Sequence, residues 1–353
     1  MWSPAEGAGQ TPGMAKTAPP APSVDAAELT AELTIPLTTT EAAYVEAARS
    51  ANTLRGYRSD WREFTTWCAH HDLSPMPAAP STITGYLTDL AQAGAKVGTM
   101  ARRLSALRFA HRLRELPDPT ATARVVAVWE GIRRTHGAPP EQSKPLMPPE
   151  LFHVLDACPQ VKTWRTARPD EPHLGGARDR ALLLVGFVAA LRRSELAALQ
   201  VHDVAEHEHG LVLTLPRSKT NQTGQEVELV ILPRAHNPQH CPVRALRWWL
   251  SLAGITDGPL LQGVTKANRP SGKPLNAQSI NALVQAAVER AGYDPAPYSA
   301  HSLRAGFVTY AHLRGASDRA IARQTRHRSL ASVGTYVRVE GAWTGNAATE
   351  LGW

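Results

Sequence analysis

The feature that most constrains the fold is a proline-rich stretch that interrupts the chain. Residues 137–150, GAPPEQSKPLMPPE, contain five prolines and one glycine. Because proline fixes φ and removes a backbone donor, this stretch disfavours both helix and strand. The chain has 353 residues, 43% of them hydrophobic, and is long enough for two globular units. We therefore predict a linker at 137–148 with a separate domain on each side.

The region before the linker divides into a tail and a helical domain. Residues 1–38 are rich in Ala, Pro, Thr and Gly, and we predict a disordered tail because this composition buries too little apolar surface to offset the entropy of ordering. Residues 39–136 carry apolar side chains at helical spacing. The apolar face of the first long helix is formed by Leu54, Tyr57, Trp61, Phe64 and Trp67. A small all-α domain is therefore predicted at 39–136.

Residues 149–353 are predicted to form a second domain that is mainly α with a small antiparallel sheet. Helical patterns cover residues 151–158, residues 177–199, and a segment that starts at Pro242 and is stopped by Gly254. Leu211–Leu215 and Val227–Ile231 are rich in β-formers and are joined by a polar segment containing Gly224. This pattern is typical of a hairpin.

The charge distribution indicates an anionic partner. The formal net charge is +7, and nine basic residues against three acidic ones lie between Lys96 and Arg134. The three cysteines are far apart and odd in number, which argues against a disulfide framework and for a reducing compartment. The sequence has no long apolar run and no signal peptide pattern. We therefore expect a cytoplasmic protein with no membrane segment.

The C-terminal part gathers residue types suited to attack on a DNA phosphodiester by a side-chain hydroxyl. The transition state carries extra negative charge on the non-bridging oxygens, and guanidinium groups match that geometry well. A proton acceptor for the nucleophile and a general acid for the departing 5′ oxygen complete the requirement. The stretch 301–338, HSLRAGFVTYAHLRGASDRAIARQTRHRSLASVGTYVR, holds an arginine, two histidines and a tyrosine with hardly an acid.

The order of these residues resembles the tyrosine recombinase (phage integrase) family, in a pattern similar to Cre-like members. GFVAALRRSELAAL resembles the first box, LPRSKTNQTG the β-hairpin lysine, and HSLR the His-x-x-Arg box. The resemblance implies catalytic roles for Arg192, Lys219, His301, Arg304, His327 and Tyr336, with Glu195 as the supporting acid.

Each of these residues has a role in the family's reaction. Arg192 and Arg304 would hold the phosphate, Lys219 would act as general acid and His301 would handle a proton. His327 would be a further phosphate donor and Tyr336 the nucleophile.

The resemblance also implies a fold and an activity. Residues 39–136 would be the helical core-binding (SAM-like) domain and residues 149–353 the mixed α/β, mostly helical catalytic domain. The implied enzyme is a site-specific recombinase that cleaves and rejoins DNA through a 3′-phosphotyrosyl intermediate, for integration, excision or resolution. It would need no metal, ATP or other cofactor.

One residue departs from the family pattern. The family usually has glycine immediately before the histidine or tryptophan of its last box, and this chain has Arg326 there. If that position requires a positive φ, an arginine is strained there. A catalytically weakened DNA-binding protein of the same fold is therefore the alternative function. A topoisomerase of the same chemistry is less favoured, because non-specific relaxation needs no reader domain.

The expected partners are double-stranded DNA and further copies of the chain. Family members work as a homo-tetramer on two duplex sites, with a dimer on each site. A C-terminal helix is exchanged between protomers, and the tail with Trp343, Ala347 and Leu351 at four-residue steps is the candidate here. Contacts with DNA phosphates and bases are expected from Arg55, Arg58, Lys96, Arg102, Arg103, Arg108, Asn276, Gln278 and Asn281.

Two histidine-containing segments hold residues that can bind a metal. His207 and His209 lie on the same side of an extended chain, and His236, His240 and Cys241 lie near a helix start. Neither segment supplies a full ligand set at a typical spacing. We therefore expect no metal, and the first segment is expected to be a solvated loop.

Overall fold

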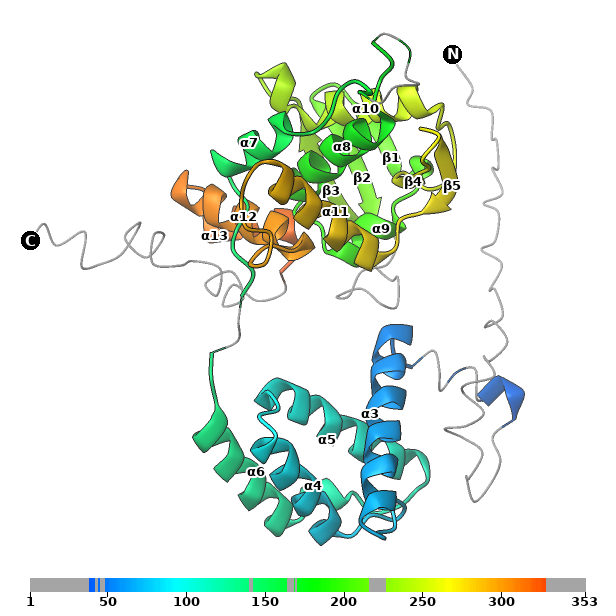
Figure 1. The fold of residues 1–353 in the computed structure, drawn as a ribbon, viewed down its shortest axis with the longest axis vertical. Coiled ribbons are helices and arrows are strands. Elements are labelled where there is room, and N and C mark those ends of the chain that lie inside the picture. The colour runs from blue at the N-terminus through cyan, green and yellow to red at the C-terminus, as the bar shows by residue number, and fades with distance from the viewer. Residues whose placement is uncertain are drawn as a thin grey trace, which may run out of the picture. The chain divides into compact units, whose positions relative to one another are not determined.

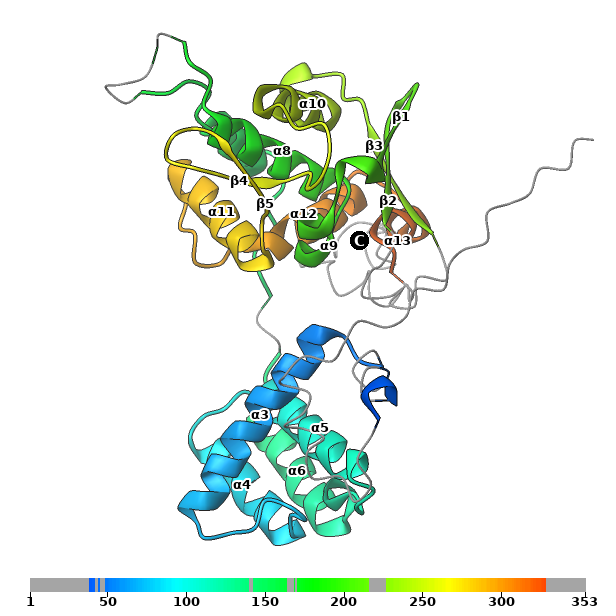
Figure 2. The ribbon, with the colours of Figure 1, turned by 90° about the vertical axis from the view of Figure 1, so that its right-hand side faces the viewer.

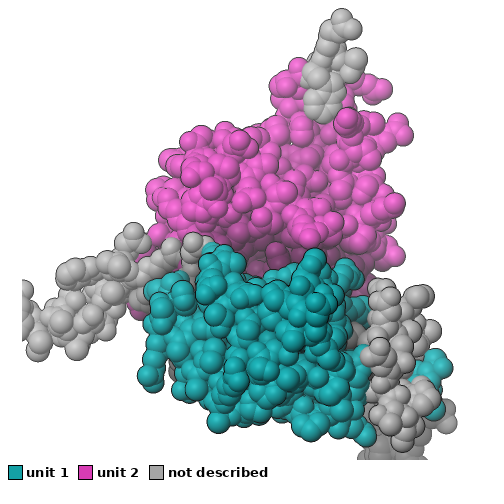
Figure 3. Space-filling view, turned by 60° about the horizontal axis from the view of Figure 1, so that its bottom comes forward, with its two compact units in different colours: residues 1–140 teal, residues 141–353 magenta. Residues whose placement is uncertain are grey.

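The computed structural model describes residues 38–41, 44, 48–139, 142–163, 168, 170–215 and 227–327. The chain divides into two compact units, residues 1–140 and 141–353, which Figure 3 colours separately. The boundary between the units falls inside the proline-rich stretch. The tail predicted at 1–38, apart from Thr38, and the predicted C-terminal helix lie outside the described residues. The finer domain limits at 38, 136 and 148 stay predictions.

The N-terminal unit is helical, as the sequence predicts. Its elements are α3 (Ala51–His70), α4 (Pro80–Gln92), α5 (Val97–Leu113), the 3-10 turn η1 (Pro119–Ala121) and α6 (Ala123–His136) (Figure 1). The helix α3 begins at Ala51 because the Ser50 side chain accepts a hydrogen bond from the backbone N–H of Thr53. On its predicted apolar face, Leu54 and Phe64 are buried. Phe64 packs in a core that α4, α5 and α6 complete.

The second unit is a mixed, mostly helical domain. Its helices are α7 (Glu150–Asp156), α8 (Leu174–Val188), α9 (Arg193–Ala198), α10 (Pro242–Ala253), α11 (Ala277–Arg290), α12 (Ala300–Leu313) and α13 (Asp318–Thr325), with 3-10 turns η2 (Val201–Asp203) and η3 (Pro238–His240). The helix α8 is buried along almost its whole length and packs against α10, α11 and α12 (Figures 1 and 2). From Ala181 to Val188 the helix is apolar on all sides, as expected for a helix that other elements cover on all sides. No helix in the described ranges combines the length and apolarity needed to cross a membrane.

Two small antiparallel sheets complete this unit. The strands β1 (Val204–His207), β2 (Gly210–Leu215) and β3 (Glu228–Pro233) pair in the order β1-β2-β3, and β4 (Gln262–Val264) pairs with β5 (Pro270–Pro274). The predicted hairpin is confirmed, with Leu213 opposite Val230 in β2 and β3. The interpretation of the segment around His207 as a loop was wrong, because it forms β1. Pairing with β2 makes this strand, since its own side chains are largely exposed and give no apolar alternation.

The continuous helical pattern at 177–199 is the second point at which the structure differs from the sequence prediction. The helix α8 ends at Val188, the backbone turns through Ala190 with φ at 48°, and α9 starts at Arg193. The intervening sequence contains no glycine or proline, so no breaker signal marks the turn. The turn is held by tertiary contact, because the Ala190 carbonyl accepts a hydrogen bond at 2.6 Å from the Arg304 guanidinium.

Candidate active site

The turn between α8 and α9 places Arg192 at the start of a helix instead of inside one. Arg192 has extended backbone angles, φ −71° and ψ 149°, and is the N-cap residue of α9. The carboxylate of Glu195 accepts hydrogen bonds from the Arg192 backbone N–H at 2.9 Å and from its guanidinium at 2.7 Å. The Arg192 side chain is 20% exposed and that of Glu195 is 2% exposed. The buried carboxylate thus holds a partly exposed guanidinium in place.

Arg304, on α12, joins three parts of the second unit. Its guanidinium donates to the carbonyl of Ala190 and to the carbonyl of Thr325, each at 2.6 Å, and to Nε2 of His327 at 3.0 Å. The residue is 1% exposed. A buried guanidinium with several charge-assisted bonds is a rigid connection. Arg304 therefore fixes the turn before Arg192 relative to the end of α13.

His327 follows α13, and its hydrogen bonds assign the tautomer of its ring. The Thr325 hydroxyl donates to the Ile321 carbonyl at 2.7 Å, so it accepts from Nδ1 of His327 at 2.8 Å. The Nε2 atom accepts from Arg304. Burial, followed by the charges of Arg304, Arg192 and Arg326, lowers the pKa of His327 to about 4. The ring is therefore neutral at pH 7, with its proton on Nδ1.

His301 lies in the first turn of α12, where the Ser299 hydroxyl accepts from its backbone N–H at 3.1 Å. The residue as a whole is exposed. Desolvation, followed by the charges of Arg304 and Arg192, lowers the pKa of its imidazole. The lowered pKa keeps this imidazole neutral at pH 7, the form in which it can accept a proton.

Arg326 has a positive φ, the conformation in which an arginine at this position is strained. It ends α13 with φ 56° and ψ 45°, in the left-handed region. Its side chain, 7% exposed, donates to Glu195 at 2.6 Å and lies 3.4 Å from the carboxylate of Glu228. Glu195 is thereby shared between two guanidinium groups. Burial raises the pKa of Glu195, but Arg326 and Arg192 outweigh it, and the resulting pKa lies below its usual value.

The structure therefore brings together Arg192, Glu195, His301, Arg304 and His327 from separate segments of the second unit. The predicted general acid Lys219 and the predicted nucleophile Tyr336 lie outside the described residues, and their roles stay predictions. Sequence reasoning missed the role of Thr325 in orienting the His327 ring and the place of the Arg326 side chain inside the site. For Arg326, the departure from glycine was the available signal.

The basic residues predicted to bind DNA in the N-terminal unit differ in how exposed they are. Arg55 is exposed on α3, and Lys96 is exposed at the start of α5. Arg103 is only 15% exposed and contacts Glu63, the Tyr86 hydroxyl and Asp60. These contacts hold α5 against α3 and α4, so Arg103 is less suited to reach a phosphate.

The three other residues of that unit that are predicted to bind DNA are Arg102, Arg108 and Arg58. The Arg102 side chain is 50% exposed and lies 3.0 Å from Asp60. Arg108 is 46% exposed and pairs with Asp118 at 2.9 Å. Arg58 is partly buried. Their DNA contacts stay predictions.

Two of the three predicted base-reading side chains have local structural contacts in the second unit. The Asn276 side chain caps α11 by accepting from the backbone N–H of Ser279 at 2.7 Å. The side-chain amide oxygen of Asn281 accepts from the backbone N–H of Ala300 at 3.0 Å, which ties α11 to the start of α12. Gln278 is exposed between them. The base-reading role of all three stays a prediction.

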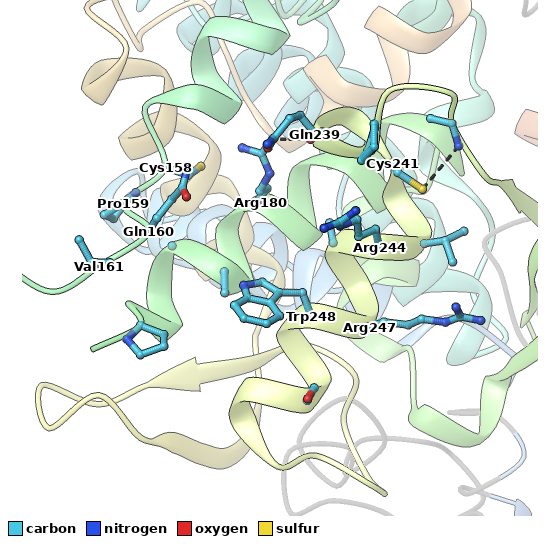
Figure 4. A pocket seen from close by; sticks show the side chains of 18 of the residues that line it. Cys158, Pro159, Gln160, Val161, Arg180, Gln239, Cys241, Arg244, Arg247 and Trp248 are labelled. Atoms are coloured by element: carbon cyan, nitrogen blue, oxygen red, sulfur yellow. Dashed lines mark hydrogen bonds between the residues drawn. The ribbon is translucent and has the colours of Figure 1, made fainter. Parts of the chain in front are cut away.

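A cavity of about 1020 Å³ opens in the second unit (Figure 4). Its lining includes Arg180, Arg244, Arg247 and Trp248, the last three of them on α10. Among the described catalytic candidates, Arg192, His301, Arg304 and His327 are not part of this lining. In the part of the chain that the structure describes, no group of three or more His, Cys, Asp or Glu residues is placed to hold a metal ion.

Comparisons with known proteins agree with this geometry. Residues 166–342 match the phage integrase family, and residues 41–113 match the phage integrase N-terminal SAM-like domain. The integrase/recombinase xerD homolog of Selenomonas ruminantium is 33% identical over 310 residues, which cover 87% of this chain and 87% of that protein. The recombinase Cre of Escherichia phage P1 is 25% identical over 213 residues, which cover 60% of this chain and 58% of that protein.

Solved structures show the same fold at lower sequence identity. The Tn1549 transposon integrase, solved in complex with transposon right end DNA, has a TM-score of 0.58 at 13% identity, over 92% of this chain and 98% of that chain. A lambda integrase tetramer bound to a Holliday junction has a TM-score of 0.55 at 16% identity, over 82% of this chain and 72% of that chain. With both domains matched in order, this chain belongs to the phage integrase family of tyrosine recombinases.

Proposed function

We propose that this chain is a site-specific recombinase that cleaves DNA with the hydroxyl of Tyr336 and rejoins it through a 3′-phosphotyrosyl bond. The observation that carries the proposal is the network around Arg304. Its guanidinium joins the turn before Arg192 to His327, and Glu195 anchors Arg192 from the other side. We infer that this network, together with His301, whose pKa the charges of Arg304 and Arg192 help to lower, forms the reaction site.

Each step of the proposed cleavage has a residue suited to it. Arg192 and Arg304 supply positive charge where the phosphate oxygens gain negative charge, and their positions are set before DNA binds. His301 accepts the proton of the Tyr336 hydroxyl as the new O–P bond forms. Lys219 gives a proton to the 5′ oxygen as the old P–O bond breaks.

The reverse reaction rejoins the strand. A 5′ hydroxyl attacks the phosphotyrosyl bond and releases Tyr336, so one phosphodiester is made for each one broken. The phosphodiester energy is kept in the covalent intermediate, and the cycle needs no ATP. When the attacking hydroxyl comes from a second duplex, the strands are exchanged.

The proposed partners are double-stranded DNA and three further copies of the chain. Solved relatives include a lambda integrase dimer bound to a core site and a tetramer bound to a Holliday junction. We propose the same arrangement here, with one dimer on each of two sites. The exposed basic residues of α3 and α5, Arg55 and Lys96 among them, are proposed to follow the phosphates. Since the substrate is DNA, the proposed compartment is the cytoplasm.

Trapping of the covalent intermediate tests the proposal. Purified protein is incubated in EDTA with fragments of its source genome enriched for the DNA that flanks its own gene. The reaction is stopped with SDS, and the DNA that stays covalently attached is sequenced. Adducts with the wild type and none with Tyr336→Phe support the tyrosine nucleophile and identify the site. Specific DNA retention by both proteins without any adduct supports the alternative, a DNA-binding protein of the same fold.

A further inference from the structure

The residue before His327 adopts a conformation in which side chains are disfavoured. Arg326 has φ 56° and ψ 45°, and its position lets the His327 backbone N–H bond to the Ala322 carbonyl at 3.1 Å. Glycine adopts these angles without steric cost, whereas an arginine brings a Cβ atom into a crowded position. A compensating interaction of the Arg326 side chain would therefore account for an arginine at this turn.

The Arg326 side chain makes such interactions with groups near the predicted catalytic residue Arg192. Its guanidinium donates to Glu195 at 2.6 Å and to the carbonyl of Gln324 at 3.1 Å, and it lies 3.4 Å from the carboxylate of Glu228. The side chain of Glu228, the first residue of β3, is 15% exposed. Arg326 thus connects the end of α13 to α9 and to the strand that follows the segment with Lys219.

The contact with Glu195 changes how that carboxylate acts on Arg192. One oxygen of Glu195 accepts from the Arg192 guanidinium, and the other accepts from the Arg192 backbone and from Arg326. A carboxylate shared by two guanidinium groups is held on both sides and neutralises less of the charge of either. Arg192 therefore keeps a fixed position and more of its positive charge for a bound phosphate.

We propose that Arg326 is a positioning residue for DNA cleavage, which fixes Glu195 and through it Arg192, and which ties α13 to the base of the β2–β3 hairpin. This inference rests on the proposed recombinase function. It reverses the meaning of the departure from glycine, because the arginine strengthens the site instead of weakening it.

The test measures the rate of covalent adduct formation at saturating DNA, using the site recovered by the trapping experiment. Arg326→Gly restores the residue usual in the family and relieves the backbone, but it removes the contacts with Glu195 and Glu228. We expect the rate to fall roughly tenfold, less than for the loss of a direct transition-state donor. Arg326→Lys keeps a charge but cannot bridge two carboxylates, and an intermediate rate is expected. Arg323→Ala, at an exposed arginine of the same helix, is the matched control and should leave the rate unchanged.

The pH dependence separates positioning from a merely structural role. Arg326 contributes to the lowered pKa of Glu195, so its removal raises that pKa. The acid limb of the rate profile should then move to higher pH in Arg326→Gly, whereas a loss of folded protein would scale the profile without moving it. If Arg326→Gly does not fold, Arg326→Lys shows the same shift to a smaller extent.

The outcomes distinguish this inference from the proposed function. No adduct with the wild type overturns the proposed function, and the inference that rests on it. Adducts with the wild type, together with an unchanged rate and an unmoved acid limb in Arg326→Gly, overturn the inference alone. A faster rate in Arg326→Gly would mean that the arginine weakens the enzyme, which also overturns it.

Discussion

Each unit contains a buried carboxylate among arginines, and the pKa values of the two carboxylates move in opposite directions. Asp60 in α3 is 1% exposed and lies 3.0 Å from Arg102, yet burial raises its pKa against the opposing charges of Arg102 and Arg103. Glu195 is 2% exposed, and there the charges of Arg326 and Arg192 outweigh burial and lower the pKa.

Hydrogen bonds account for part of the difference, and the charge of Arg326 is the largest single cause that lowers the pKa of Glu195. Neither carboxylate oxygen of Asp60 has a hydrogen-bond partner, whereas Glu195 accepts three bonds from Arg192 and Arg326. Hydrogen bonds to the charged form stabilise it beyond what charge proximity gives. The comparison shows that an arginine close to a buried carboxylate does not by itself lower the pKa of that carboxylate. In the second unit, the charge of Arg326 and the hydrogen bonds from Arg192 together keep Glu195 ionised.

The largest effect on cleavage is expected from the substitution of Arg304. The surroundings of Asp60 in the N-terminal unit are not proposed to take part in cleavage. Arg304→Ala removes a phosphate donor and leaves two carbonyls without their partner, so cleavage should fall by roughly 10³-fold or more. Adduct formation at saturating DNA measures this. Arg314→Ala, at the exposed end of the same helix, is the control. A cleavage rate of Arg304→Ala within about tenfold of the wild-type rate would contradict the proposal that Arg304 holds the phosphate.

The two carboxylates should differ in their contribution to stability. Glu195→Gln breaks a buried, hydrogen-bonded ion pair and should cost about 3 kcal/mol of the unfolding free energy of the second unit. Asp60→Asn removes a charge that burial disfavours, and should change the stability of the N-terminal unit by about 0.5 kcal/mol or less. Urea unfolding, with each unit followed separately by hydrogen exchange, measures both. Equal losses for the two variants would contradict the account of their hydrogen bonding.

The same pair should respond to pH with opposite signs. Because the folded pKa of Glu195 lies below 4.5, its contribution is present above that pH and is lost as the pH falls through the folded pKa. Because the folded pKa of Asp60 lies above 3.8, its charge destabilises the fold increasingly as the pH rises from 3.8 through the folded pKa. Unfolding of the wild type, Glu195→Gln and Asp60→Asn from about pH 3 to about pH 6 tests this. Slopes of the same sign at the two positions would rule it out.

The smallest effect concerns backbone strain alone. Glu115, exposed in the N-terminal unit, has φ 54°, close to the φ of Arg326. Glu115→Gly should stabilise its unit by up to about 1 kcal/mol, because it relieves the left-handed conformation. Arg326→Gly should destabilise its unit in spite of the same relief, since it loses two ion pairs. Thermal unfolding of Glu115→Gly and Arg326→Gly measures this difference. Similar shifts in the unfolding temperature of both variants would mean that the ion pairs of Arg326 contribute little to stability.

Short sequence signals, such as helix-end residues and alternating apolar residues, predicted the elements that form through interactions between residues close in sequence. Pro242 starts α10, and Gly254 ends it with φ 63°, as the helix-end pattern predicts. The β2–β3 hairpin follows its alternating apolar residues. The family resemblance supplied the site residues, which no local rule identifies, because Arg192 and His327 are 135 positions apart (327 − 192) and only tertiary contacts bring them together.

The points that sequence reasoning missed are positions where tertiary contacts decide the local structure. The turn at Ala190 interrupts a strong helical pattern because Arg304 binds its carbonyl. The side-chain amide oxygen of Asn281 bonds to the start of α12, a tertiary contact that the sequence does not indicate, while its base-reading role stays a prediction. Arg326 looked like a defect because its backbone could be judged from sequence, whereas its contact with Glu195, 131 residues away, could not.

Peptide mapping of the trapped adduct by mass spectrometry tests the central claim most directly. Wild-type protein is reacted with its recovered site in EDTA, the DNA is digested, and the modified peptide is sequenced. The account predicts a nucleotide joined through its 3′ phosphate to Tyr336, and no modified peptide from Tyr336→Phe. A nucleotide on another residue, a linkage through a 5′ phosphate, or an adduct that survives in Tyr336→Phe would contradict it.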